Sequence, residues 1–279
     1  MIGDMHCHTT MSDGSTSPEM LVQFAVDAGL DFIAVTDHDT MDGALEMDKL
    51  VTEEFRFIRG IEFSCETPAG KCHILGYDYD PSDPLFLSAL AEGAALRQEK
   101  LRDRQQYLEA TLHITFTEAE LAWIYSQKSP GKPHFAKLLV DRGIAETIDE
   151  AIQKFINPHK PRRDRITGHT AVAAILHAGG IPVWAHPLGG EGEKRLTVEK
   201  FQVQLDYLIG QGIRGLECHY SRYCRSDIEF LTAQTQRHGL LISGGSDYHG
   251  AVKKNLPLGQ LSADGAAVHP ETLSILKML

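Results

Sequence analysis

The sequence predicts an α/β protein whose strands close into a barrel and which carries an all-helical insertion domain. Short runs rich in Ile, Val and Phe alternate with longer segments of helical period, which is the pattern of parallel α/β architecture. Seven such runs favour barrel-like closure over a two-layer sandwich. They span residues 2–8, 31–36, 56–64, 72–78, 181–185, 213–218 and 240–244.

The first helix has clear signals at both ends. Ser17 can cap the helix with its side chain, Pro18 suits the first helical position, and Glu19 lies near the positive end of the helix. Gly29 suits the left-handed conformation that ends many helices, so we expect the helix to stop there.

The alternation of strands and helices stops between about residues 84 and 160. The run PLFLSALAEGAALRQEKLRDRQQYLEATL predicts a long charged helix, and shorter helical segments follow at TEAELAWIYSQ, PHFAKLLVDRG and TIDEAIQKFI. We therefore expect residues 84–160 to form a helical insertion that caps the barrel. Residues 1–83 and 161–279 would form the barrel itself.

Composition narrows the class of protein. The chain has 279 residues, 42% of them hydrophobic and 23% charged, which is ordinary for a soluble globular protein. No apolar run approaches 18 residues, so we expect no membrane span. The first residues lack the basic start and apolar stretch of a signal peptide, and we expect a cytoplasmic protein.

Charge and cysteine content exclude other classes. The five cysteines are odd in number and form no CxxC pair, which argues against a disulfide framework and a zinc ribbon. A net charge of −11 argues against non-specific wrapping of nucleic acid, which needs many cations. A small phosphorylated substrate remains compatible with this charge. No obligate protein partner is evident.

Metal-ligating residues recur at the ends of the predicted strands. His6 and His8 are two positions apart, so they share one face of the first strand, and paired imidazoles suit Zn, Mn or Fe. Further candidates follow later strands: Asp13, Asp37, His38, Glu62, His73, His186, Asp247 and His249. Because the carboxyl ends of barrel strands form one face, we expect these side chains to converge there.

Not every histidine fits this pattern. There are 14 histidines in the chain. We expect mostly structural roles for His113, His159, His169, His177, His219, His238 and His269, which lie outside it.

The motifs DMHCH, TDH, GIE, AHP and SDYH, with Asp13 and His73, resemble those of the PHP (polymerase and histidinol phosphatase) family in the same order. The resemblance covers roughly residues 1–80 and 160–260 and implies a distorted (β/α)7 barrel. The insertion resembles that of stand-alone PHP phosphoesterases acting on nucleotides. Their GRPH-like motif reads GKPH here, residues 131–134, with Lys in place of Arg.

The resemblance implies two to three divalent ions (Mn, Zn or Fe). The first would be held by His6, His8, Glu62 and Asp247. Glu62 would bridge to a second ion held also by His73 and His186. The third would be held by Asp13, His38 and His249.

We expect catalytic roles for Asp37, Glu62 and Asp247. Asp37 would orient His38 or a bound water, and a plain loop cap is the alternative for it. A hydroxide between the first two ions could attack phosphorus in line, with the third ion on a phosphate oxygen. Candidate phosphate contacts are Lys132, His134, Arg163 and Arg222, with Arg163 in the basic run KPRRDR. A solvated connector is the alternative for that run.

The sequence therefore predicts a metal-dependent phosphoesterase acting on phosphomonoesters of small nucleotides, such as a 3′,5′-bisphosphonucleotide. The nearest alternative is a 5′-3′ exonuclease that takes the ends of short RNA or DNA. A histidinol-phosphate phosphatase would share the metal site. An amidohydrolase ranks lower, because the candidate ligands outnumber those that a binuclear hydrolase needs. A non-catalytic metal-binding module also ranks lower, because every ligand position still holds a residue that can bind metal.

Overall fold

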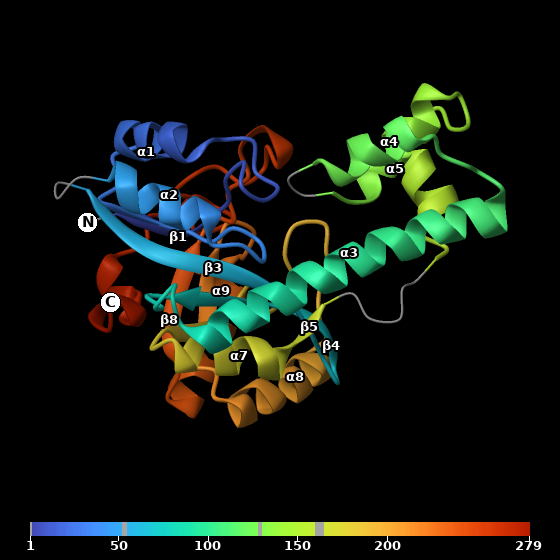
Figure 1. The fold of residues 1–279 in the computed structure, drawn as a ribbon. Coiled ribbons are helices and arrows are strands. Elements are labelled where there is room, and N and C mark those ends of the chain that lie inside the picture. Colours follow the sequence, from blue (N-terminus) through green and yellow to red (C-terminus); the bar gives the residue numbers. More distant parts are fainter. Residues whose placement is uncertain (1, 52–54, 128–129, 160–164) are drawn as a thin grey trace. The chain divides into compact units, whose positions relative to one another are not determined.

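The structure is a computed structural model and describes residues 2–51, 55–127, 130–159 and 165–279. The chain divides into two compact units, residues 1–91 with 166–279 and residues 92–165. The first unit carries every strand of the described chain (Figure 1).

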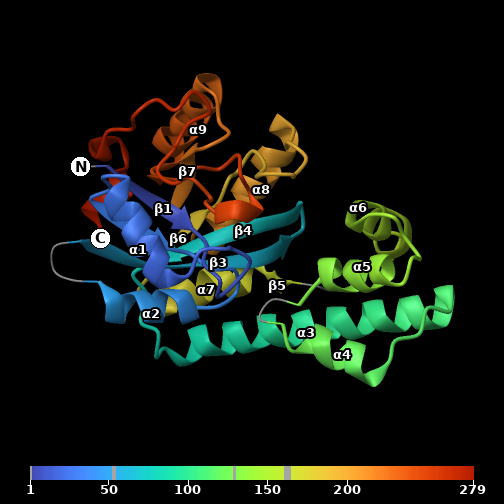
Figure 2. The ribbon, with the colours of Figure 1, turned by 90° about the horizontal axis from the view of Figure 1, so that it is seen from above.

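Seven strands of the first unit form a barrel, as predicted. They are β1 (Gly3–Cys7), β2 (Phe32–Val35), β3 (Arg56–Thr67), β4 (Gly70–Tyr77), β6 (Ile181–Trp184), β7 (Gly215–Tyr220) and β8 (Leu241–Gly245), paired in that order. An isolated parallel bridge between Cys7 and Tyr248 joins the two ends of this path. The predicted barrel-like closure is confirmed, and Figure 2 shows the strands from above.

The parallel α/β pattern indicated by the sequence does not extend to β4. This strand runs antiparallel to both β3 and β6. Thr67 pairs with Gly70 across a two-residue turn, and Gly70 has a φ of 134°. A parallel partner needs a crossover of a dozen or more residues, and the chain between β3 and β4 is far too short for one. The structure also contains a two-residue strand that the sequence did not suggest, β5 (Ile166–Thr167), which pairs with β3.

Helices flank the barrel. They are α1 (Pro18–Asp27), α2 (Asp42–Leu50), α7 (Gly168–His177), α8 (Val198–Gln211) and α9 (Arg225–His238), followed by the short 3-10 helices η2 (Gly250–Val252), η3 (Pro270–Thr272) and η4 (Ser274–Lys277). Figure 1 shows α1 and α2 on one side of the strands and α7 and α8 on the opposite side. The predicted limits of α1 are confirmed: Ser17 accepts a hydrogen bond from the Met20 amide, and Gly29 has a φ of 69°.

The side chains of β2 alternate between two buried layers, one inside the barrel and one between the barrel and its helices. Phe32 and Ala34 pack with Leu75, Tyr77 and other residues of the barrel interior. Ile33 and Val35 pack on the other side, against apolar side chains of α1 and α2. Successive side chains of a strand point to opposite faces, so a fully apolar strand can serve both layers.

The second unit is built from helices. It contains most of α3 (Pro84–Leu112), with α4 (Glu118–Tyr125), α5 (Lys132–Asp141), α6 (Ile148–Ala151) and the π-helical turn η1 (Ile152–Ile156). Its own apolar core includes Leu108, Ile124, Phe135 and Leu139. The first turns of α3 belong to the barrel unit, because Phe86 stacks on Tyr79 there. The unit therefore begins eight residues later than the predicted boundary at residue 84, at residue 92.

Across the described residues, every helix is too short or too polar to cross a lipid bilayer.

Candidate metal centre

All nine predicted metal ligands lie together in the barrel unit. They are His6, His8, Asp13, His38, Glu62, His73, His186, Asp247 and His249, and they form overlapping groups of possible ligand atoms. Most follow the carboxyl ends of parallel strands. His73 instead lies in the first half of β4, and the antiparallel direction of that strand brings its beginning to the same end of the barrel. The antiparallel direction of β4 thus places His73 beside the other candidate ligands.

The first group has the spacing of an ion's ligands. His6 Nε2 lies 3.3 Å from Glu62 Oε2 and 3.6 Å from Asp247 Oδ1, and His8 Nε2 lies 3.2 and 3.3 Å from the same two atoms. Ligands at about 2.1 Å from a tetrahedral ion are about 3.4 Å apart. The two nitrogens and Glu62 Oε2 are buried and make no hydrogen bond within the described chain. Buried polar atoms without partners are costly, so this donor set fits a divalent ion.

Glu62 presents its two oxygens to different sets of histidines. Oε2 faces His6 and His8, and it lies 3.1 Å from His38 Nδ1. Oε1 lies 3.0 Å from His73 Nδ1 and 3.1 Å from His186 Nε2. A fully buried carboxylate with donors on both oxygens has the arrangement that a bridge between two cations requires.

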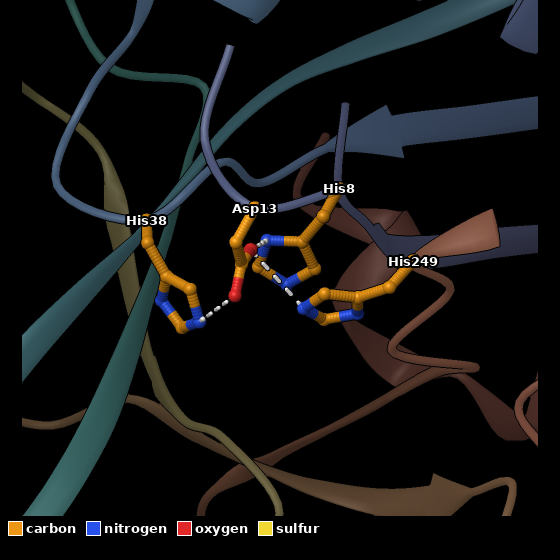
Figure 3. A group of neighbouring side chains, drawn as sticks. All are labelled: His8, Asp13, His38 and His249. Atoms are coloured by element: carbon orange, nitrogen blue, oxygen red, sulfur yellow. Dashed lines mark ion pairs between the residues drawn. The ribbon is translucent and has the colours of Figure 1, made fainter. Parts of the chain in front are cut away.

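Asp13 organises the third group (Figure 3). Its Oδ1 lies 3.2 Å from His249 Nε2 and 3.7 Å from His8 Nδ1, and its Oδ2 lies 3.9 Å from His38 Nε2. His8 therefore faces the first group with one ring nitrogen and Asp13 with the other. The Asp13 side chain is 42% exposed, so this part of the centre is open to solvent and to ligands.

Charges within the cluster are strongly coupled. Burial lowers the pKa of His8, but the nearby carboxylates of Asp247 and Glu62 outweigh it and raise the pKa to about 9. His186 responds in the same way to Glu193 and Glu62, and its pKa rises to about 10. Burial raises the pKa of Glu62, yet the surrounding histidines hold it well below its ordinary value. The carboxylates thus stabilise positive charge at the positions that metal ions would take.

Two ligand residues have unusual backbone conformations. His186 has a φ of 29° and Asp247 a φ of 60°, and neither is glycine. Such conformations cost free energy, and they cluster where a side chain must be aimed precisely. Each is the second residue after a barrel strand, β6 or β8, where the chain leaves the end of that strand.

Glu217 is a site residue that the sequence reasoning missed. It is fully buried in β7; Oε1 accepts a hydrogen bond from His6 Nδ1 at 2.8 Å and Oε2 accepts one from the His186 backbone amide at 2.7 Å. An acidic residue between Leu216 and Cys218 in the predicted strand IRGLEC was the available signal.

Neighbouring side chains also hold the carboxylate of Asp247 in place. Its Oδ2 accepts a hydrogen bond from Tyr220 Oη and lies 3.3 Å from Lys253 Nζ.

Asp37 holds the loop that follows β1. Oδ1 accepts hydrogen bonds from the Thr9 amide at 2.8 Å and from Ser12 Oγ at 2.5 Å, and Oδ2 accepts one from Thr9 Oγ1 at 2.7 Å. These contacts are those of the loop-cap alternative. They fix the segment that carries Asp13, and a direct catalytic role for Asp37 stays a prediction.

The four predicted phosphate contacts lie in different parts of the chain. Lys132 and His134 belong to the second unit, where Lys132 Nζ donates to Asn157 Oδ1 and His134 Nδ1 accepts from the Gly131 amide. Arg163 lies outside the described residues. Arg222 follows β7 and forms an ion pair with Glu191. Their roles in phosphate binding stay predictions.

Comparison with known proteins decides the family. The model of the PHP domain family matches residues 4–211, which is most of the chain and includes all the proposed ligands except Asp247 and His249. The chain belongs to the PHP domain family. The resemblance found in its motifs is therefore confirmed.

Curated relatives match nearly the whole chain. It is 29% identical to a 3′,5′-nucleoside bisphosphate phosphatase of Chromobacterium violaceum, covering 88% of this chain and 86% of that protein. It is also 29% identical to the 5′-3′ exoribonuclease Rnm of Escherichia coli, covering 89% and 85%. A phosphoribosyl 1,2-cyclic phosphate 1,2-diphosphodiesterase of Eggerthella lenta is 27% identical, covering 90% and 95%.

Solved structures agree with this PHP fold. A protein from Bifidobacterium adolescentis described as a metal-dependent phosphoesterase superposes with a TM-score of 0.75 at 30% identity, over 94% of this chain and 93% of that one. A protein from Chromobacterium violaceum described as an amidohydrolase, with bound sulfate and no metal, superposes with a TM-score of 0.78 at 25% identity. It covers 100% of this chain and 95% of that one.

Proposed function

We propose that this PHP protein is a metal-dependent phosphoesterase that hydrolyses phosphomonoesters of small nucleotides, with a 3′,5′-bisphosphonucleotide as the representative substrate. The observation that carries the proposal is the division of Glu62 between two sets of histidines, 3.0 to 3.3 Å from its two oxygens. Clustered divalent ions are the usual means of catalysing phosphoryl transfer to water.

Two to three ions of Mn, Zn or Fe would occupy the centre. His6, His8, Glu62 and Asp247 would hold the first, and Glu62 with His73 and His186 the second. Asp13, His38 and His249 would hold the third. Bound ions of this kind lower the pKa of water and neutralise charge on phosphoryl oxygens.

The chain's own residues prepare the centre for that chemistry. Glu217 accepts the Nδ1 proton of His6 and so directs the Nε2 lone pair toward Glu62 and Asp247. Asp37 fixes the loop that carries Asp13. The partial exposure of Asp13 leaves a side from which a phosphate can approach.

A second candidate function is 5′-3′ exonucleolytic cleavage of short RNA or DNA. It is supported by exoribonucleases of Haemophilus influenzae, Escherichia coli and Salmonella typhimurium that are 28%, 29% and 30% identical to this chain. We favour the mononucleotide substrate, because a net charge of −11 opposes the approach of long polyanions.

The deciding experiment compares two substrates at one salt and one metal concentration. kcat/KM is measured for adenosine 3′,5′-bisphosphate and for a short 5′-phosphorylated RNA. We expect the bisphosphate to be hydrolysed more efficiently. A clear preference for the RNA would replace the phosphatase by the exonuclease, and hydrolysis of neither phosphate ester would overturn the proposed function.

A further inference from the structure

A cavity of about 270 Å³ adjoins the candidate metal centre within the barrel unit. His73 and His186 form part of its wall, so the cavity borders directly on the proposed second ion. Trp184, Lys194, Leu196 and Gln204 also line it. The volume is near the lower end of small-molecule pockets, about 300 to 1,000 Å³, and suits part of a mononucleotide rather than an oligomer.

Gln204 is an exception in the helix that forms one side of this cavity. The buried face of α8 consists of Phe201, Gln204, Leu205 and Leu208, an apolar stripe interrupted by one amide. Gln204 is 1% exposed, and it is one of the residues that line the cavity. Burying an amide is costly unless it is hydrogen-bonded, so a buried glutamine in the wall of a cavity is suited to bind a polar ligand or water there.

The chemistry of the wall indicates the ligand. A glutamine amide offers both a donor and an acceptor, the combination that recognises the polar edge of a nucleobase. The aromatic Trp184 and the aliphatic Leu196 provide apolar surface beside it. At the exposed side Lys194 adds a positive charge, and Glu193, which faces His186, adds a negative one. A purely apolar ester group would leave the amide unsatisfied.

We propose that this cavity binds the nucleoside part of the substrate, with the Gln204 amide hydrogen-bonded to the base, while the phosphate lies beside His73 and His186. This inference rests on the proposed function, since it assigns the leaving group of that reaction. Gln204 is then a specificity-determining residue that favours nucleotides over simple phosphate esters.

Direct binding tests the cavity independently of catalysis. Adenosine 5′-monophosphate is titrated calorimetrically into the Mn-loaded wild type, Gln204→Leu and Gln202→Leu. Gln202 lies on the same helix, and its amide donates to Asp206, so it serves as the matched control. We expect Gln204→Leu to raise Kd by roughly 3- to 10-fold, the usual effect of one lost hydrogen bond, and Gln202→Leu to leave it unchanged.

Lys194→Ala provides a second variant that does not disturb the core, because Lys194 is exposed. It should also weaken binding of the monophosphate. Leucine suits the apolar stripe of α8, so Gln204→Leu should keep the wild-type Tm. Equal Kd values for the wild type and Gln204→Leu, or no binding to the wild type, would overturn the assignment of the cavity.

Kinetic measurements then test the assignment of the cavity separately from the proposed phosphoesterase function. Gln204→Leu should raise KM for adenosine 3′,5′-bisphosphate and leave kcat/KM for phenyl phosphate unchanged, because phenyl phosphate has no group to pair with the amide. An equal loss with both substrates would contradict the inference. If the monophosphate binds in a Gln204-dependent manner but no ester is hydrolysed, the cavity assignment stands and the phosphoesterase proposal fails.

Discussion

The carboxylate of Glu217 lies 2.8 Å from His6 Nδ1, and its second oxygen accepts the backbone amide of His186. One buried side chain on β7 thereby supports proposed ligands that belong to two different ions. Such outer contacts fix the ring orientation and tautomer of a metal-binding histidine, and they raise its basicity. Glu217 is therefore a positioning residue that couples two parts of the centre.

Glu217→Gln should lower metal affinity by about 10- to 100-fold. An amide has one oxygen where the carboxylate has two, so either His6 or His186 loses its acceptor. Competition with a chelator measures the affinity. Glu229→Gln is the matched control, because Glu229 is exposed on α9 and pairs only locally with Arg225. Unchanged affinity in Glu217→Gln would show that the carboxylate has no role in positioning.

Glu62→Ala should nearly abolish turnover and reduce bound metal, because it removes ligands to two proposed ions at once. His177→Ala should keep metal content near that of the wild type. His177 lies in α7, is largely exposed and pairs with Asp83 away from the cluster. Metal analysis of both purified variants gives the answer, and similar metal loss in the two would refute the assignment of Glu62.

Metal binding should release protons and weaken as the pH falls. In protein stripped of divalent ions, the pKa of His8 is about 9 and that of His186 about 10, and both imidazoles must be neutral to bind metal. Calorimetric titrations with Mn in buffers of different ionisation enthalpy count the released protons. Uptake of protons, or none exchanged at pH 7, would contradict these charge states.

The same groups predict how stability of the stripped protein depends on pH. In the folded protein the pKa values of His8 and His186 lie above the ordinary histidine value of 6.5. Their protonation therefore stabilises the fold fully below pH 6.5, and this stabilisation is lost as the pH rises through about 9 and about 10. The Tm of chelator-treated protein should therefore fall between pH 6.5 and 10. Metal-loaded protein should show a smaller decrease, since bound ions replace the protons.

Asp37→Ala should destabilise the protein by about 2 to 4 kcal/mol, because three donors of the loop after β1 lose a buried acceptor. Urea unfolding measures the change. Asp27→Ala, at an exposed acid of α1 that binds Gln23, should have little effect. Wild-type stability and metal content combined with a large loss of kcat would instead support a direct catalytic role for Asp37.

The sequence by itself determined the seven barrel strands, the first helix and the positions of the candidate metal ligands. Apolar runs bounded by turn residues specify strands through local preferences, and ligand-type residues just beyond those runs converge once the strands form a barrel. The positions of His6, Glu62 and Asp247 therefore follow from one-dimensional spacing. The PHP motifs then supplied the family, which the match over residues 4–211 bears out.

Only the tertiary structure decided the direction of β4, the role of Glu217 and the position of Gln204. Strand direction depends on the whole connection, and here a two-residue turn reverses the chain. Glu217 and His6 are 211 residues apart, and no local pattern reports a hydrogen bond between them. A buried acid or amide looks like a surface residue in sequence until the neighbours that exclude water from it are known, because desolvation is a property of the packed fold.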